Sequence, residues 1–293
     1  MALTSNPPRP RLACEISAER VIAGRANAAQ TAVEVYSHRR LPTGALHPNL
    51  ASVNVLNRDA VRLAVRDTLD TVAAGLRDAI VIIPDAAVRI LLLDFDDLPS
   101  KHDDALAVIR FRARKSLPFD ADSAIVSFQA DRTHRPVKVV AAFSPSSIIA
   151  EYEELVSDAG LAPGVVLPSV IAALGLVTAD RPTMIVKVDG PTTTVSIVEG
   201  SNLVLLRTLE VAHGDITANV LPSMVFYEDT YAAKLERVLL AGDAETATLA
   251  ASLQQELNVR VAPLAEAGLA GDTSFGDALP PSVLAPVAGG LVG

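Results

Sequence analysis

The sequence predicts an α/β protein of two related lobes, with a small α+β subdomain inserted into the first. Half of the 293 residues are hydrophobic but only 4% are aromatic, so Ala, Val, Leu and Ile must build the core. A triplet of short apolar segments suited to strands begins at Leu12 and again at Thr183, and helical and apolar segments follow each triplet. The economical interpretation is a duplication of βββαβα halves, interrupted by an α+β block at 85–158.

Charge and cysteine content restrict the function classes. The formal charge of −9, from 25 basic and 34 acidic residues, argues against general binding to nucleic acid or anionic lipid. The single Cys14 cannot form an internal disulfide, which fits a reducing, cytoplasmic compartment. The most apolar stretch, 165–177, contains Pro168 and is shorter than the ~20 residues that cross a bilayer. We therefore expect no direct membrane insertion, and a membrane role only through a partner.

The first lobe is expected at 12–84 and 159–182, after a disordered leader at 1–11. Apolar residues at helical spacing predict a helix from Arg58 to Leu76. The run 79–83 is apolar and rich in β-branched residues, as in a strand covered on both faces. The other strands are predicted at 12–16, 20–24, 32–37 and 165–168, and a second helix at 169–178.

The inserted subdomain, 85–158, is expected to contain a helix with a basic end. Ser100 is the predicted N-cap of a helix at 100–116, and Pro118 stops that helix. The basic residues near its C-terminal end complement the helix dipole, so a solvated helix face explains them without a ligand. Strands are predicted at 88–94, 124–130 and 137–143, and a helix at 146–159.

The second lobe is expected at 183–293 in reduced form. Tight turns separate its first three strands. The predicted strands are 183–188, 194–199, 202–210, 238–241 and 259–261, and the predicted helices are 218–237 and 244–256. The remaining residues form a tail interrupted by Pro and Gly.

Each strand triplet carries a carboxylate at its first hairpin, an arrangement typical of the actin-like ATPase architecture, in which opposed hairpins bracket nucleotide phosphates. In the second hairpin, small residues let backbone N–H groups approach a phosphate and a carboxylate can hold Mg²⁺ through water. The candidates there are Asp189, Gly190, Thr192 and Thr193. The first hairpin, around Glu15, fits this chemistry poorly. The alternative is that Asp189 belongs to a plain turn and Glu15 is an ordinary edge charge.

Other chemistries have little support. The histidines are scattered, without the i, i+4 spacing of a zinc site. No Gly-x-Ser-x-Gly segment surrounds any serine, so acyl transfer is not expected.

The chain resembles the PilM family of type IV pilus assembly proteins, which are cytoplasmic relatives of FtsA. The resemblance runs from about Leu12 to Gly290. It rests on the order of several stretches rather than on any one of them: 81–84, 89–93, 109–119 with its Leu-Pro-Phe ending, 158–163 and 189–200. In the family, the run that ends the third of these stretches starts with an acidic residue. Here that run, within 109–119, has basic residues before Leu-Pro-Phe.

The resemblance implies a scaffold. Family members bind the short cytoplasmic tail of PilN, an inner-membrane protein, in a groove between the first lobe and the inserted subdomain, and GspL of type II secretion is arranged similarly. By correspondence, the candidate partner-binding residues are Arg110, Arg112, Arg114, Lys115, Leu117, Pro118 and Phe119. The expected location is the cytoplasm, peripheral to the inner membrane through the partner and the pilus assembly complex.

Relatives also bind ATP with Mg²⁺ between the lobes, and here the corresponding residues depart from the family pattern. Glu15 and Ser17 stand where the first phosphate loop has Asp and Gly, and Asp243 follows Gly242 where the adenosine loop has a second Gly. The helical subdomain that clasps adenosine is trimmed to one helix. We expect a degenerate site with no cofactor, or with weakly bound ATP and Mg²⁺, in a non-catalytic protein. The alternatives are a working ATPase or kinase and a GspL-like secretion component.

Overall fold

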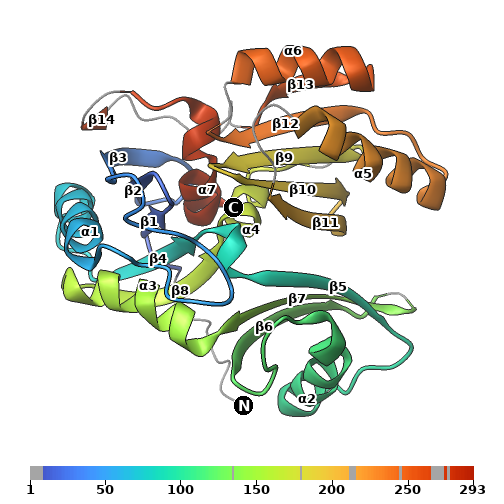
Figure 1. Ribbon diagram of the computed structural model, residues 1–293, viewed down its shortest axis with the longest axis horizontal. Coiled ribbons are helices and arrows are strands. Elements are labelled where there is room, and N and C mark those ends of the chain that lie inside the picture. Colours follow the sequence, from blue (N-terminus) through green and yellow to red (C-terminus); the bar gives the residue numbers. More distant parts are fainter. Residues whose placement is uncertain are drawn as a thin grey trace.

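The computed structural model describes residues 9–133, 135–178, 180–210, 216–243, 246–264, 274–275 and 278–293. Within this part of the chain, three sheets form two lobes and an inserted subdomain (Figure 1). No helix among these residues has the length and apolar character required to cross a membrane.

A six-stranded mixed sheet forms the first lobe. Its strands in spatial order are β14 (Ser274–Phe275), β3 (Val33–Arg40), β2 (Arg20–Ala26), β1 (Leu12–Ile16), β4 (Asp78–Ile83) and β8 (Ala162–Pro168). Strands β1, β2 and β3 form an antiparallel meander, whereas β4 is parallel to both β1 and β8. Every residue of β1 is buried because helices cover both faces of the sheet.

Helices α1 (Arg58–Val72) and α3 (Ser146–Asp158) cover one face of this sheet. The side chain of Asn57 caps α1 by accepting a hydrogen bond from the N–H of Ala60. Val61, Val65 and Leu69 recur at helical spacing and pack into the core that includes β1. The predicted amphipathic helix is therefore confirmed, although it ends four residues before Leu76.

A five-stranded sheet forms the second lobe. Its strands in spatial order are β11 (Asn202–Glu210), β10 (Thr192–Glu199), β9 (Thr183–Asp189), β12 (Arg237–Gly242) and β13 (Arg260–Pro263). Helices α5 (Ile216–Tyr231) and α6 (Thr246–Leu257) lie along this lobe, and α5 contributes Val220 and Tyr227 to the core (Figure 1). The predicted strand triplet and the parallel strand after it are thus present in both lobes.

Two helices occupy the space between the sheets, α4 (Ser169–Leu174) and α7 (Pro281–Val292). Their backbones touch: a Cβ on Gly289 would lie 2.1 Å from the carbonyl oxygen of Ala172, and one on Gly175 would lie 2.5 Å from that of Gly289. Only glycine permits so close an approach of two helices.

The C-terminal region differs from the sequence-based interpretation. An interrupted tail was expected, but α7 is a regular helix that contains Pro286 and is buried at every position from Ser282 to Leu291. Burial on both sides outweighs the hydrogen bond that proline removes. Strand β14 pairs with β3, and α7 packs on β1, β2 and β4. Helix α7 also packs on β12 of the second lobe, so it contacts both lobes, whereas β14 extends the sheet of the first.

The inserted subdomain is a three-stranded antiparallel sheet with one helix packed on it. The sheet order is β5 (Arg89–Phe95), β7 (Val137–Pro145) and β6 (Ala124–Asp131), and a 3₁₀ turn, Asp85–Ala87, leads into β5. Helix α2 (His102–Ala113) continues into a 3₁₀ turn, Arg114–Ser116. The expected cap was wrong: Lys101, not Ser100, occupies the N-cap position, and no side chain caps this helix.

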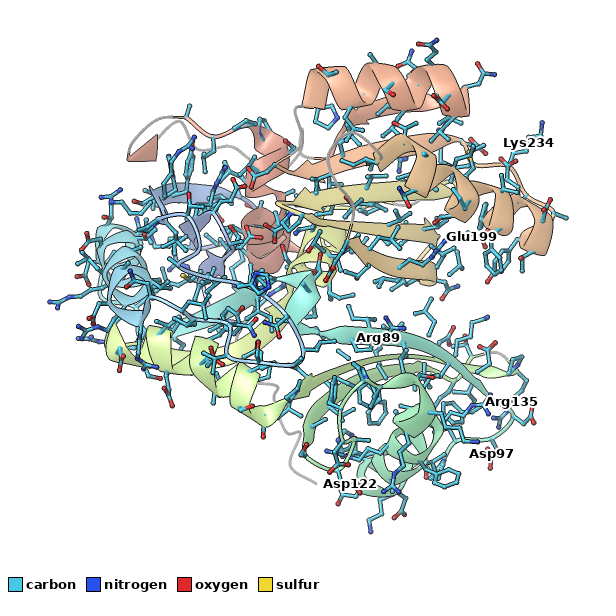
Figure 2. All side chains as sticks on the ribbon, in the orientation of Figure 1. Arg89, Asp97, Asp122, Arg135, Glu199 and Lys234 are labelled. Carbon is cyan, nitrogen blue, oxygen red and sulfur yellow. The ribbon has the colours of Figure 1, made fainter. Side chains whose placement is uncertain are left out.

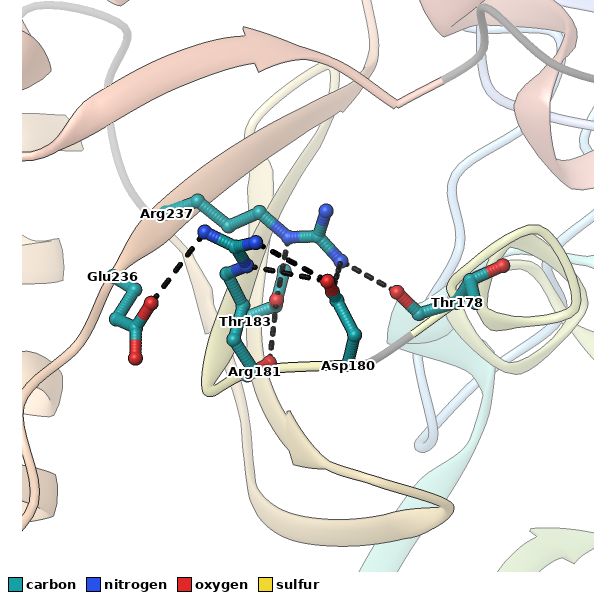
Figure 3. A network of polar contacts seen from close by, with 6 residues as sticks. All are labelled: Thr178, Asp180, Arg181, Thr183, Glu236 and Arg237. Carbon is teal, nitrogen blue, oxygen red and sulfur yellow. Dashed lines mark hydrogen bonds and ion pairs between the residues drawn. The ribbon is translucent and has the colours of Figure 1, made fainter.

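A polar network fixes the segment that enters the second lobe (Figure 3). Arg237, the first residue of β12, donates to the hydroxyl of Thr183 at 2.7 Å and to the carbonyl oxygen of Thr178 at 2.6 Å. Arg181 forms an ion pair with Glu236 at 3.6 Å. The start of β9 is thereby tied to the start of its parallel neighbour β12.

Candidate functional site

The two predicted hairpins face each other between the lobes. Glu15 and Ser17, at the end of β1, line the same small cavity as Asp189 and Gly242 of the second lobe. Gly190 lies at the tip of the β9–β10 hairpin, where a Cβ would be 3.9 Å from a carboxylate oxygen of Glu19. The structure thus brings these two predicted hairpins to one cavity.

The two threonines lie elsewhere. Thr192 lines a larger groove on the side of β5, whereas Thr193 is completely buried. Because side chains alternate along a strand, Thr193 shares the face of Val195, which belongs to the core of the second lobe. Thr193 therefore has no access to the space between the hairpins.

The first hairpin is closed by its own serine. The hydroxyl of Ser17 donates to the carbonyl oxygen of Arg20 at 3.0 Å and accepts from the N–H of the same residue at 3.3 Å. The backbone N–H of Ser17 also donates to that carbonyl, at 2.9 Å. These bonds satisfy the turn internally and direct the serine toward its own backbone.

An ion pair joins the lobes at the mouth of this cavity. The guanidinium of Arg20 in β2 lies 2.6 Å from the carboxylate of Asp243, just after β12. Gly242 has a φ of +80°, and a Cβ there would lie 1.9 Å from the carbonyl oxygen of Val188. That close approach lets the N–H of Asp243 donate to the same carbonyl at 2.8 Å, which aims the carboxylate at the first lobe. Burial raises the pKa of Asp243, while the charge of Arg20 opposes the rise.

A buried lysine, which the sequence analysis missed, forms the second link. Lys187 in β9 is 2% exposed, and its Nζ lies 3.5 Å from a carboxylate oxygen of Asp85 and 3.7 Å from one of Asp189. Burial alone would lower the pKa of Lys187, but the charges of Asp85, Asp189 and Glu15 raise it, so the amine stays charged. The available signal was a lysine inside the otherwise apolar segment 183–188.

Asp85 is held from two sides. One of its carboxylate oxygens accepts a hydrogen bond from the backbone N–H of Val170 at 2.7 Å, and the other faces Lys187. Val170 lies in the first turn of α4, in the first lobe, and Lys187 lies in β9 of the second lobe. Asp85 begins the inserted subdomain, so its carboxylate connects all three parts.

Glu15 is a buried acid with a strongly raised pKa. It is 6% exposed and accepts a hydrogen bond from the hydroxyl of Ser169 at 2.5 Å. Burial raises the pKa of Glu15 to about 7; Lys187 and the Ser169 hydrogen bond oppose the rise, and Asp189 and Asp243 add to it. At neutral pH this carboxyl is therefore divided between its two protonation states.

Acidic groups outnumber basic ones in this interlobe cluster. Its carboxylates are Glu15, Asp85, Asp189 and Asp243, and its cations are Arg20 and Lys187. All of these except Asp85 line a cavity of about 10 Å³, room for about one water molecule. The arrangement holds the lobes together through pairs of the chain's own charges.

A much larger groove, of about 1120 Å³, lies between the inserted subdomain and the second lobe. Strand β5 and the turn before it form one wall, β11 and α5 form the other, and the loop at Leu50 closes one side. Figure 2 places Arg89 in the space between these walls. The apolar lining includes Leu50, Ala51, Leu92, Leu206, Pro222 and Phe226.

The predicted basic cluster lies on α2 and the turn after it, and half of it serves local structure. Arg110 donates to the carbonyl oxygens of Ala121 and Ala124, and Arg114 pairs with Asp122 at 2.7 Å. Arg112 and Lys115 are exposed. Leu117 and Phe119, on either side of Pro118, pack against the core of the inserted subdomain.

Comparison with family models finds no match, and no curated protein matches the sequence. Solved structures do match. A chain of the PilM-PilN type IV pilus biogenesis complex has a TM-score of 0.81 at 18% identity, over 98% of each chain. The cytoplasmic domain of EpsL, an inner membrane component of the type II secretion system of Vibrio cholerae, has a TM-score of 0.55 at 10% identity, over 95% of this chain and 93% of its own.

A Bacteroides thetaiotaomicron protein of unknown function with an actin-like ATPase fold has a TM-score of 0.51 at 11% identity, over 85% of this chain and 89% of its own. These likenesses establish the fold. The chain has the actin-like α/β architecture that the sequence predicts.

Proposed function

We propose that this protein is a scaffold of type IV pilus assembly that binds the cytoplasmic tail of a PilN-like inner-membrane protein. The observation that carries the proposal is the match to a chain of the PilM-PilN complex over 98% of both chains. The groove of about 1120 Å³ supports the proposal, because its apolar lining suits a short peptide. It lies between the inserted subdomain and the second lobe, not where the sequence analysis expected it, and none of the seven predicted partner-binding residues lines it.

The same proposal assigns no nucleotide to the space between the lobes. Three features support this assignment. The cavity has room for about one water molecule, its carboxylates outnumber its cations, and Asp243 occupies the approach to Arg20. A triphosphate would have to break the Arg20–Asp243 pair and enter a field of like charge, so these residues do not fit it.

A second candidate is a component of a type II secretion system, favoured by the likeness to the EpsL cytoplasmic domain. The lower TM-score of that match, 0.55 against 0.81, places it behind the pilus role. Both roles put the protein beside the inner membrane through a partner. The identity of the membrane protein whose tail binds would separate them.

The test is a titration of the full chain with a labelled peptide from the cytoplasmic tail of a PilN-like inner-membrane protein, followed by fluorescence anisotropy. We expect saturable binding, and none of a scrambled peptide of the same composition. Binding that does not saturate, or equal binding of the scrambled peptide, would refute the tail-binding role. The Arg112→Ala/Lys115→Ala variant tests the exposed part of the basic cluster: a loss of affinity would assign the tail to α2 rather than to the groove.

Nucleotide is tested separately by calorimetry with ATP and Mg²⁺. We expect no saturable heat with the wild-type chain. Saturable binding that Asp189→Ala weakens would instead support a working actin-like ATPase or kinase.

A further inference from the structure

We propose that the outer face of helix α2, in the inserted subdomain, makes direct contact with the surface of an anionic membrane. This α2 face consists of Val108, Phe111, Arg112 and Lys115, which are all exposed. None of them lines the interlobe cavity or the groove of about 1120 Å³. The contact therefore goes beyond tail binding and depends on different residues.

Helical spacing puts these four residues on one side of α2. They occupy positions i, i+3, i+4 and i+7, which are neighbours on a helix surface. A different side of the helix carries Ala105, Ile109 and Ala113, which are buried in the core of the inserted subdomain. Figure 1 shows α2 on the side of the inserted sheet that is turned away from the second lobe. The α2 face is thus open to an external surface.

Phe111 is the apolar centre of this face. It is 77% exposed, whereas Phe119 of the following turn packs against the core of the inserted subdomain. Burial of a phenyl ring is favourable, and the fold of this chain leaves most of that gain unused at Phe111. An external apolar layer could supply it.

The cations of the α2 face are not neutralised within the described part of the chain. The segment 108–116 contains four basic residues and no acidic one. Arg114 pairs with Asp122, and Arg110 donates to backbone carbonyl oxygens. Arg112 and Lys115 form no ion pair among the described residues. Both can therefore attract an external anion.

The acidic residues around this face leave it positive. Asp103 and Asp104 lie in the first turn of α2, and Asp104 is about 12 Å from Arg112 along the helix axis, beyond a Debye length of about 8 Å at physiological salt. The loop after the helix adds Asp120 and Asp122, so 108–122 contains four basic and two acidic residues. The face is a local exception in a chain whose formal charge is −9.

A membrane surface fits this face better than a peptide does. The face is the convex side of a helix, and neither cavity described above includes it. A bilayer interface needs no pocket: it accepts an aromatic ring at the level of the headgroups, and its anionic lipids attract arginine and lysine. One exposed phenyl ring beside two cations matches such a surface.

The charge of the remaining chain gives the contact a direction. Anionic lipid repels a chain of charge −9, but screening limits that repulsion to about 8 Å. An orientation that turns α2 toward the bilayer combines local attraction with burial of Phe111. Because stable attachment takes two signals, this contact is weak by itself and orients a chain that a bound tail already holds beside the membrane.

The experiment uses the absence of tryptophan from the sequence. Phe111→Trp places a single fluorescent reporter at the centre of the α2 face. Its emission is measured without tail peptide, with vesicles of phosphatidylcholine and with vesicles of equal parts phosphatidylcholine and phosphatidylglycerol. We expect a saturable shift to shorter wavelength with the anionic vesicles alone. No shift with these vesicles, or an equal shift with both kinds, would overturn the proposal.

Two variants test location and charge. Phe226→Trp is the matched control, because Phe226 is 57% exposed on α5, and its emission should not change. Arg112→Gln/Lys115→Gln in the Phe111→Trp chain should weaken binding about 25-fold, since each basic residue near an anionic surface contributes about fivefold. An equal shift in Phe226→Trp, or binding by the charge variant within about twofold of its parent, would contradict the assignment.

The wild-type chain and the tail peptide complete the test. The wild-type chain should sediment with the anionic vesicles and not with the neutral ones; if it stays in solution with both, the contact belongs to the introduced tryptophan and the proposal fails. The tail titration contains no lipid, so tail binding and membrane contact can fail separately. If the tail peptide alone shifts the emission of Phe111→Trp, the α2 face binds protein and the membrane contact is wrong.

Discussion

Replacing Glu15 by Gln should stabilise the protein in a way that depends on pH. The pKa of Glu15 rises from its ordinary value of 4.5 to about 7, chiefly because the carboxyl is buried. The folded state therefore holds a proton that the unfolded chain releases between these values. The favourable contribution of Glu15 is complete below the unfolded pKa and is lost as the pH rises through the folded pKa. Above that range the ionised carboxylate opposes folding.

The size of the effect follows from the two pKa values. The ionised carboxylate costs about 3 kcal/mol at about pH 8 and less than about 1 kcal/mol at about pH 5. Glutamine cannot ionise and keeps an oxygen for the hydrogen bond from Ser169. The difference in unfolding free energy between Glu15→Gln and the wild type should therefore grow by about 2 kcal/mol between these pH values.

The assay is urea unfolding of both proteins at the two pH values, with Glu19→Gln as the control because Glu19 lies in the same hairpin but is half exposed. A difference that stays constant with pH would refute the reasoning. So would an equal change in the control.

Three further unfolding experiments test the interlobe cluster. Lys187→Met leaves the buried carboxylates without their cation and should cost about 3 to 5 kcal/mol in urea unfolding; a cost below about 1 kcal/mol would contradict the buried charge assignment. A double-mutant cycle of Arg20→Ala and Asp243→Ala should give a coupling of about 1 to 3 kcal/mol, whereas additive effects would show that the pair does not join the lobes. Gly242→Ala should lower the thermal midpoint, since a Cβ meets the carbonyl of Val188 at 1.9 Å and φ is +80°; an unchanged midpoint would contradict that close approach.

The duplicated fold could be predicted from the sequence because the apolar and turn patterns of single segments agree with the strands that these segments form in the complete fold. The apolar segments at 12–16 and 183–188, with turn residues after each, predict strands without any knowledge of the rest of the chain. The same segments placed Glu15 and Asp189 at facing hairpins, because related halves repeat the position of the first turn. Local pattern also predicted α1 and its apolar face.

The missed features depend on contacts between distant segments. Lys187 looks like an exposed strand residue until Asp85, about a hundred positions earlier, is placed beside it. Arg110 looks free until the loop at Ala121 folds back onto it. Pro286 signals an interruption, and only the surrounding core makes a helix there favourable. No local pattern reports such pairings.

The glycine crossing of α4 and α7 limits how the halves of the molecule can move. Helices whose main chains touch at Gly289 and Ala172 have no layer of side chains to shear past one another. Sliding of α7 along α4 is therefore blocked over the stretch from Ala172 to Gly175. Because α7 also packs on β12, this rigid crossing anchors the second lobe against the first at their junction.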